Sequence, residues 1–235
     1  MTHVVNLNWE LECAAREIDA GDQNGFLNKN VGIYLWVYRN KAASRVIYVG
    51  KSVQSPFKKR LAEHFRNLYG SGYSVQHIDE EVDWLDFFAI EMCGKSHAEL
   101  NSHEKVCWYT PLEDPHYFRA TFFENIEKRT RILSHYLDHL SFAFATIPSS
   151  AAFARDAKRV EAAIGRGLYD LYLREIKLRH NLDAGRCKLP GWNTSDTFVG
   201  RHAVKAVEGS LEIRHQGPAV PKEIRLITRY PLADS

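Results

Sequence analysis

The sequence has few cysteines, no long apolar run and no targeting segment. Its four cysteines form no Cys-x-x-Cys pair, which argues against a disulfide framework and against a thiol redox motif. Charged residues interrupt each apolar run well before it reaches the length of a membrane span. The N-terminus lacks the basic start and apolar stretch of a signal peptide. We therefore expect a cytoplasmic protein with no membrane partner and with free thiols at Cys13, Cys93, Cys107 and Cys187.

An excess of charge of one sign is also absent. The chain has 31 Lys and Arg against 29 Asp and Glu, and this net charge of +2 does not by itself indicate a nucleic-acid-binding protein. The basic residues are unevenly placed, however, with Lys58 and Lys59 in one of several clusters. A focused basic surface needs no large net charge, so nucleic acid remains a candidate ligand. The length of 235 residues fits one elaborated domain.

One group of metal-capable residues occurs in the middle of the chain. It has the spacing Cys93-x3-His97-x5-His103-x3-Cys107, which fits no common zinc module. The same stretch, over residues 96–109, also has the pattern of a helix. A structural zinc site and a plain helix are both open interpretations, and we favour the helix.

Hydrophobic periodicity predicts a chain of mixed helices and strands. Residues 31–39 and 45–51 alternate and are rich in β-branched and aromatic side chains, so they predict an antiparallel hairpin. A helix follows and ends near Tyr69, just before a glycine-containing segment. Further helices are predicted over residues 8–20, 96–109, 118–138 and 150–179, and further strands over residues 82–93, 140–147, 211–214 and 223–227.

Four side chains of this hairpin and helix form the most informative group in the sequence. Tyr34 and Tyr48 take matching places on the two strands, and Arg60 and His64 follow one helical turn apart. A guanidinium binds phosphate through two hydrogen bonds, while phenols and an imidazole can pass protons. Each of these residues alone would ordinarily be a packing or surface residue. Their ordered occurrence within 31 residues indicates a reaction centre.

These residues resemble the signatures of the GIY-YIG nuclease family. Gly32-Ile33-Tyr34 matches the first signature, and Tyr48-Val49-Gly50 matches the second with valine in place of the common isoleucine. Arg60 and His64 stand where the family places an arginine and a histidine or tyrosine. The resemblance implies an α/β (α+β) fold with a small, mainly antiparallel three-stranded sheet flanked by helices.

The resemblance also divides the chain. An N-terminal helical segment would cover residues 1–30, and the nuclease domain residues 31–195. Because residues 70–138 form a longer stretch than in minimal members, we interpret them as a helical insertion. Residues 196–235 would be a C-terminal extension.

The family's metal-binding glutamate has two candidates in this chain. Glu161 lies on the predicted helix that directly follows the strand at 140–147, which is the order that the resemblance implies. Small residues flank it along the helix, so its carboxylate can approach a sheet and remain open to an ion. Glu124 is the alternative, but no equally clear strand precedes it. We favour Glu161.

The resemblance further implies an asparagine beyond this glutamate. The segment Pro190-Gly191-Trp192-Asn193 resembles the aromatic–asparagine step that ends the catalytic region of restriction-type members. Asn193 is therefore the candidate, with Asn181 as the alternative.

The activity implied by the resemblance is hydrolysis of DNA phosphodiester bonds with one divalent ion, Mg²⁺ or Mn²⁺. Glu161 would anchor the ion, Arg60 would hold the phosphate, and Tyr34 would act as the general base or orient the water. Tyr48 and His64 would complete a hydrogen-bond relay. The substrate would also contact Lys51 and the backbone at Gly50, and Lys58 and Lys59 belong to the same expected substrate-binding surface.

A restriction-type enzyme that cuts both strands would also form a homodimer. An alternative of a different class stays open at this point. The chain could be a nucleic-acid-binding or assembly module that kept the fold without cleavage.

Overall fold

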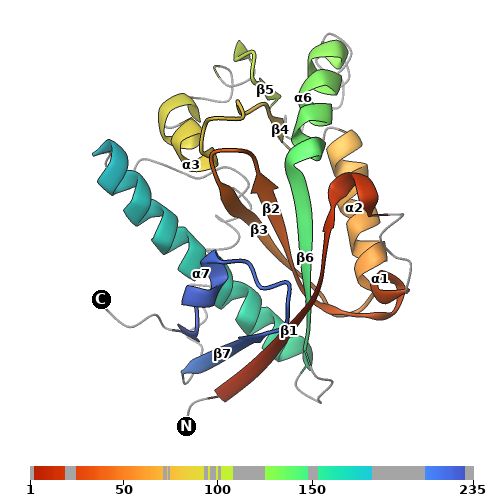
Figure 1. Cartoon of the computed structure of the whole chain (residues 1–235). Helices are drawn as coiled ribbons and strands as arrows, with labels where there is room; N and C mark the ends of the chain where they lie inside the picture. The colour runs from red at the N-terminus through yellow and green to blue at the C-terminus, as the bar shows by residue number, and fades with distance from the viewer. Residues whose placement is uncertain are drawn as a thin grey trace.

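The computed structural model describes residues 3–18, 25–70, 73, 75–92, 95, 99, 102–107, 125–147, 153–181 and 210–230. It has a mixed α/β architecture (Figure 1). The strands are β1 (His3–Ala14), β2 (Gly32–Arg39), β3 (Ser44–Ser52), β4 (Val75–Gln76), β5 (Val106–Cys107), β6 (Leu140–Thr146), β7 (Leu211–Gln216) and β8 (Arg229–Tyr230). The α-helices are α1 (Phe26–Lys29), α2 (Phe57–Tyr69), α3 (Trp84–Phe87), α6 (Ile126–His139) and α7 (Phe153–His180). Short 3₁₀ helices are η1 (Ala15–Glu17) and η3 (Glu223–Leu226), and η2 (Phe88–Met92) is a π-helix.

The main sheet has the strand order β3-β2-β6-β1-β7-β8. Its neighbours run antiparallel, except that β1 and β7 run parallel. The sheet is therefore mainly antiparallel, as the sequence predicts. The prediction of three strands is wrong, because β1, β7 and the two-residue β8 extend the group of β3, β2 and β6. A separate small sheet pairs β4 with β5.

The N-terminal segment is a strand, so the helix predicted over residues 8–20 is wrong. Val5, Leu7 and Trp9 are buried on one face of β1, while the residues between them are exposed. This two-residue period outweighs the helical spacing of Leu11, Ala14 and Ile18, because the alternation already begins at Val5. Residues 3–14 thus belong to the main sheet and are not part of a separate helical segment.

Two further predicted strands are helical. Over residues 82–93 the chain forms α3 and η2, which begin where the Asp83 side chain accepts a hydrogen bond from the Leu85 N–H at 3.0 Å. The apolar side chains Trp84, Leu85 and Phe87 are all buried, which does not fit the two-sided pattern of a strand. Residues 223–226 form η3. Conversely, part of the predicted helix at residues 96–109 is a strand, because Val106 and Cys107 form β5.

The other predicted elements are confirmed where the structure describes them. Strands β2 and β3 form the expected hairpin, and α2 follows them. Strand β6, helix α7 and strand β7 lie at the expected places. Helix α6 covers the later part of the predicted 118–138 helix and leads directly into β6 (Figure 1). The region between residues 70 and 138 thus combines α6 with the short β4–β5 sheet and α3.

Strand β6 provides the main packing surface for helix α2. Phe142 and Phe144 point to the same face and pack against Phe65 and Phe57 of α2, with ring centroids 5.8 and 5.0 Å apart. The alternating alanines of β6 point to the other face. Helix α7 lies on a different side of the sheet from α2 (Figure 1). Gly32 lets β2 approach β6 closely, since a Cβ there would lie 2.1 Å from the Ala145 carbonyl oxygen.

Helix α7 also covers the open edge of strand β3. The Val46 N–H donates to the Tyr172 hydroxyl at 3.0 Å, and the Arg45 guanidinium lies 5.6 Å from the centre of the Tyr172 ring. A free strand edge offers such N–H groups to other chains. At Val46 this group is satisfied within the molecule.

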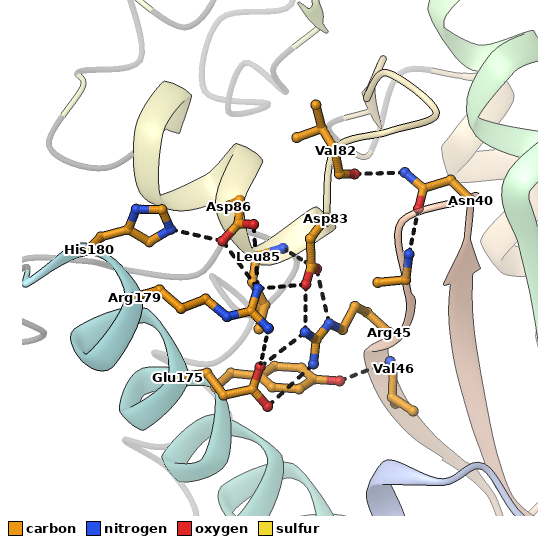
Figure 2. A network of polar contacts seen from close by, with 12 residues as sticks. Asn40, Arg45, Val46, Val82, Asp83, Leu85, Asp86, Glu175, Arg179 and His180 are labelled. Carbon is orange, nitrogen blue, oxygen red and sulfur yellow. Dashed lines mark hydrogen bonds and ion pairs between the residues drawn. The ribbon is translucent and has the colours of Figure 1, made fainter.

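A partly buried charged network joins α7 to β3 and α3 (Figure 2). Asp83 accepts hydrogen bonds from Arg45 Nε at 3.0 Å and from Arg179 Nη1 at 2.8 Å. Arg45 also pairs with Glu175 at 3.0 Å. Burial alone would raise the pKa of Asp83, but the bonds from Arg45 and Arg179 lower it below its ordinary value. The network fixes the C-terminal half of α7 against the hairpin.

None of the helices in the described ranges combines the length and the hydrophobicity that crossing a bilayer requires.

Candidate active site

The centre of the site is the pairing of Tyr34 with Gly50 across the hairpin. Tyr34 on β2 lies opposite Gly50 on β3, and only 1% of Tyr34 is exposed. A Cβ at Gly50 would lie 2.3 Å from Cζ and 2.4 Å from the hydroxyl of Tyr34. The contact of substrate with Gly50 stays a prediction, and the structure gives this glycine a further reason. The missing side chain makes room for the Tyr34 phenol.

Helix α2 brings Arg60 and His64 to the same phenol. Both residues lie on the side of α2 that faces the hairpin, four residues apart. Arg60 Nε donates to the Tyr34 hydroxyl at 3.3 Å, and His64 Nε2 lies 2.5 Å from that oxygen. Tyr48, from the neighbouring strand, has its ring centroid 6.1 Å from that of Tyr34. The structure thus brings together the four residues that carry the family resemblance.

The second nitrogen of His64 contacts Tyr73, and Tyr73 in turn contacts Asn67; sequence reasoning missed both residues. His64 Nδ1 lies 2.9 Å from the Tyr73 hydroxyl, which also accepts a hydrogen bond from Asn67 Nδ2 at 3.2 Å. Asn67 could have been found, because it lies three residues after His64 on the same face of α2. Tyr73 follows the end of the helix, and nothing in its sequence surroundings marks it.

Aromatic rings enclose the His64 imidazole. The centroid of the imidazole lies 5.1 Å from that of Trp36, 5.5 Å from that of Tyr48 and 5.8 Å from that of Tyr73. This burial, together with the charge of Arg60, lowers the pKa of His64 to about 3. The imidazole is therefore neutral at physiological pH, with one N–H donor and one acceptor nitrogen.

The two phenols are likewise neutral at physiological pH. Burial raises the pKa of Tyr34 well above its ordinary value, and the charge of Arg60 opposes this shift. Burial and the negative charge of Glu161 raise the pKa of Tyr48 to about 12. Tyr34 therefore holds its proton in the free protein, so it can take a proton from water only while giving its own to another group.

Glu161 lies at the same end of the hairpin, on helix α7. It is buried and forms an ion pair with Nζ of Lys51, the residue after Gly50 on β3. Burial raises the pKa of Glu161, while Lys51 and then Arg60 oppose the shift. The charge of Glu161 in turn acts on Tyr48. The carboxylate, the guanidinium and the phenols therefore share one electrostatic environment around the edge strand β3.

The donor set fits a hard divalent cation anchored by one carboxylate. Mg²⁺ prefers oxygen ligands and keeps several waters, so a single protein carboxylate can hold it. Glu161 is the acidic side chain whose charge couples to both Tyr48 and Arg60. Among the described residues, no group of three or more His, Cys, Asp and Glu side chains could hold a metal ion. A Mg²⁺ or Mn²⁺ ion bound at Glu161 would take its other ligands from water and substrate.

Basic side chains border this site. Lys58 and Lys59 are exposed on the first turn of α2, directly before Arg60. On α7, the exposed Lys158 contributes positive charge at Glu161. These groups give the rim of the site a positive character on two elements.

Two predicted site residues lie outside the described residues, namely Asn193 and the alternative metal ligand Glu124. The alternative asparagine, Asn181, follows the last residue of α7. Its N–H donates to the Lys177 carbonyl oxygen at 3.0 Å, and its backbone has a positive φ of 49°. Such a residue ends a helix, since asparagine tolerates this conformation. In this structure Asn181 is thus a helix-capping residue.

The structure describes two of the four candidate zinc ligands, His103 and Cys107. Cys93 and His97 lie outside the described residues. His103 Nε2 pairs with Glu91 at 2.9 Å, and Cys107 is buried in β5 opposite Val75. We therefore propose no zinc site at these residues.

Comparisons with models of protein families, with curated proteins and with solved structures found no match to this chain.

Proposed function

We propose that the protein is a metal-dependent endonuclease of the GIY-YIG type, which hydrolyses DNA phosphodiester bonds. The observation that carries this proposal is the contact of the Arg60 guanidinium with the Tyr34 hydroxyl, at the end of the hairpin where Glu161 pairs with Lys51. A phosphate-binding cation, a proton-carrying phenol and a carboxylate are the groups that hydrolysis of a phosphodiester requires. They come from three separate segments of the chain.

In this proposal Arg60 holds a non-bridging phosphate oxygen through its terminal nitrogens, while its Nε stays on Tyr34. A water near Tyr34 attacks phosphorus. Its proton passes to the Tyr34 oxygen as the Tyr34 proton passes to His64 Nε2, so no free phenolate forms. The water oxygen bonds to phosphorus, the bond to the leaving oxygen breaks, and that oxygen takes a proton from solvent. His64 ends as an imidazolium.

The low pKa of His64 in the free protein requires that substrate binding changes it. A phosphodiester brings a negative charge to Arg60, and this charge offsets the positive charge that disfavours the imidazolium. Burial is the larger cause of the low pKa and remains, but proton acceptance by His64 becomes easier by the part that the charge of Arg60 contributes. This arrangement links proton transfer to the presence of the phosphate.

Glu161 would hold the divalent ion, and Lys51 opposes the rise in the pKa of Glu161 that burial causes. When bound, Mg²⁺ neutralises charge on the phosphate and on the leaving oxygen. Lys51 then has its ammonium available for a phosphate oxygen. Lys58 and Lys59 on the rim extend the positive surface toward the neighbouring backbone phosphates. Cleavage of both strands in the manner of a restriction enzyme would further require a homodimer.

The test is nicking of supercoiled plasmid by the purified chain in Mg²⁺ or Mn²⁺, against the same reaction with EDTA. We expect metal-dependent nicking that Arg60→Ala abolishes. Arg66→Ala is the matched control, because Arg66 is exposed on the same helix. Single-stranded DNA and RNA substrates would follow. Absence of metal-dependent cleavage of all these substrates would refute the enzyme proposal.

A second candidate is a nucleic-acid-binding module without cleavage. The ion pair between Lys51 and Glu161 favours it, since a carboxylate held by an ammonium can serve as a plain structural contact. Fluorescence anisotropy with labelled DNA separates the two candidates. Salt-dependent binding without any cleavage would support the module.

A further inference from the structure

His64 makes two hydrogen bonds to phenols, and the direction of each can be worked out. A neutral imidazole has one nitrogen that donates and one that accepts. The contacts are Nε2 with the Tyr34 hydroxyl at 2.5 Å and Nδ1 with the Tyr73 hydroxyl at 2.9 Å. The proton therefore sits either on Nδ1 or on Nε2, and the relay to Tyr34 works only if Nε2 is the acceptor.

The two distances favour the same assignment. N–H donors to oxygen ordinarily span about 2.7–3.2 Å, with a mode near 2.9–3.0 Å, and O–H donors make shorter bonds. The 2.5 Å contact therefore fits the Tyr34 O–H donating to Nε2, and the 2.9 Å contact fits Nδ1–H donating to Tyr73. A hydroxyl oxygen has two acceptor sites, so Tyr73 can accept from Nδ1 and from Asn67 Nδ2 together.

The place of Tyr73 is itself fixed by a residue from a distant segment. Arg129 on α6 is buried, and its Nη2 donates to the Leu68 carbonyl at 2.6 Å and to the Tyr73 carbonyl at 3.3 Å. These bonds hold the chain just beyond α2. The ring of Tyr73 also packs on Trp36, with centroids 5.9 Å apart. Helix α6 thereby positions the hydroxyl that faces His64 Nδ1.

We propose that Tyr73 is a positioning residue that holds His64 in the Nδ1–H tautomer, so that Nε2 can accept the proton of Tyr34. The catalytic consequence rests on the proposed nuclease function, whereas the tautomer itself does not. Without the Tyr73 hydroxyl, a buried Nδ1–H would lose its acceptor, and an unpaired buried donor is unfavourable. The proton would then move to Nε2, where the Tyr34 oxygen can accept it. In that tautomer Nε2 no longer receives a proton.

The test uses the full chain with ¹⁵N-labelled histidine and compares it with Tyr73→Phe. Long-range ¹H–¹⁵N correlation spectra distinguish the two tautomers of His64, whose signals are assigned with His64→Gln. We expect Nδ1–H in the unaltered chain and a shift toward Nε2–H in Tyr73→Phe. Tyr69→Phe is the control, because Tyr69 is an exposed tyrosine at the end of the same helix. It should leave the spectrum of His64 unchanged.

Plasmid nicking provides the second readout. We expect Tyr73→Phe to lower kcat about tenfold or more with KM changed less than twofold, since the lost group serves proton transfer and not substrate binding. An Nε2–H tautomer in the unaltered chain, or an unchanged tautomer and kcat in Tyr73→Phe, would overturn the positioning role. A tautomer shift in a chain that cleaves no substrate would leave this role intact and refute the nuclease proposal.

Discussion

Arg60 Nε lies 3.3 Å from the hydroxyl of Tyr34, although the two residues lie on different elements and 26 positions apart. The bond uses the inner nitrogen of the guanidinium. Arg60 Nη1 pairs with Glu63 at 2.5 Å on the more exposed side of the helix. A phosphate that approached Arg60 would compete with Glu63 and not with Tyr34. The contact between guanidinium and phenol can therefore persist while substrate is bound.

Glu161→Gln tests whether the Glu161 carboxylate anchors the divalent ion. Glutamine keeps the size of the side chain but removes the charge that anchors a cation, so we expect metal-dependent nicking to fall by about a hundredfold or more. Circular dichroism should show an unchanged fold. The control is Asp170→Asn on the same helix, where Asp170 pairs with Arg166, and it should leave nicking unchanged.

The alternative ligand is tested in the same assay. If Glu124→Gln abolished nicking while Glu161→Gln retained it, the metal site would have to be moved to Glu124.

Gly50→Ala tests the close packing of the phenol. The added Cβ would collide with the Tyr34 ring, so we expect a loss of about 1–3 kcal/mol in the free energy of unfolding and a loss of nicking. Urea unfolding of Gly50→Ala, Tyr34→Ala and the double variant would measure the coupling. In the Tyr34→Ala background the added methyl group should cost much less, because the ring that it meets is gone. Additive effects of the two changes would contradict this explanation.

His64 predicts a pH dependence of stability. Its pKa is about 3 in the folded chain, against an ordinary value of 6.5, so the unfolded chain binds more protons at intermediate pH. The contribution of His64 to stability is complete above about pH 6.5 and is lost as the pH falls toward 3. Between pH 7 and pH 4.5 this amounts to about 2–3 kcal/mol.

The comparison that isolates this effect is urea unfolding of the unaltered chain and of His64→Gln at both pH values. The variant should lose less stability on acidification than the unaltered chain. An equal loss in both proteins would show that His64 is not responsible.

The charged network of Figure 2 predicts a large effect at Asp83. Asp83→Ala would leave the buried Arg45 without its main partner and would remove the bond to the Leu85 N–H, so we expect a loss of about 3–5 kcal/mol in the free energy of unfolding. Asp138→Ala breaks an exposed pair with Arg16 and should cost about 1 kcal/mol or less. Thermal or urea unfolding of both variants provides the measurement. Similar losses would contradict a special role for the network.

The sequence was most informative where local pattern and tertiary packing agree. The hairpin of β2 and β3 and the following helix α2 have clear periodicity, so their side-chain positions could be inferred, including the approach of His64 to Tyr34. Glu161 could be placed because α7 is long and directly follows a buried strand. Its ion pair with Lys51 could not be predicted, because the pair depends on how α7 lies against the edge of the sheet.

The predictions were wrong where the local hydrophobic pattern does not match the tertiary packing. At the N-terminus, Leu11, Ala14 and Ile18 have the spacing of a helix, although the residues before them alternate, and pairing with β6 and β7 decides for a strand. At Trp84 the apolar residues are buried on several sides, so no single period describes them. Tyr73 was missed because a residue beyond a helix end has no periodicity, and its position depends on Arg129 from α6.

The hydrogen bond from the Val46 amide to the Tyr172 hydroxyl would link solubility to the proposed activity. The helix that protects this border of the sheet also carries Glu161. If α7 detached, the molecule would lose its carboxylate and at the same moment offer a bare strand for self-association. Inactivated molecules would then be the ones that aggregate. Light scattering during heating should accordingly rise in step with the loss of cleavage.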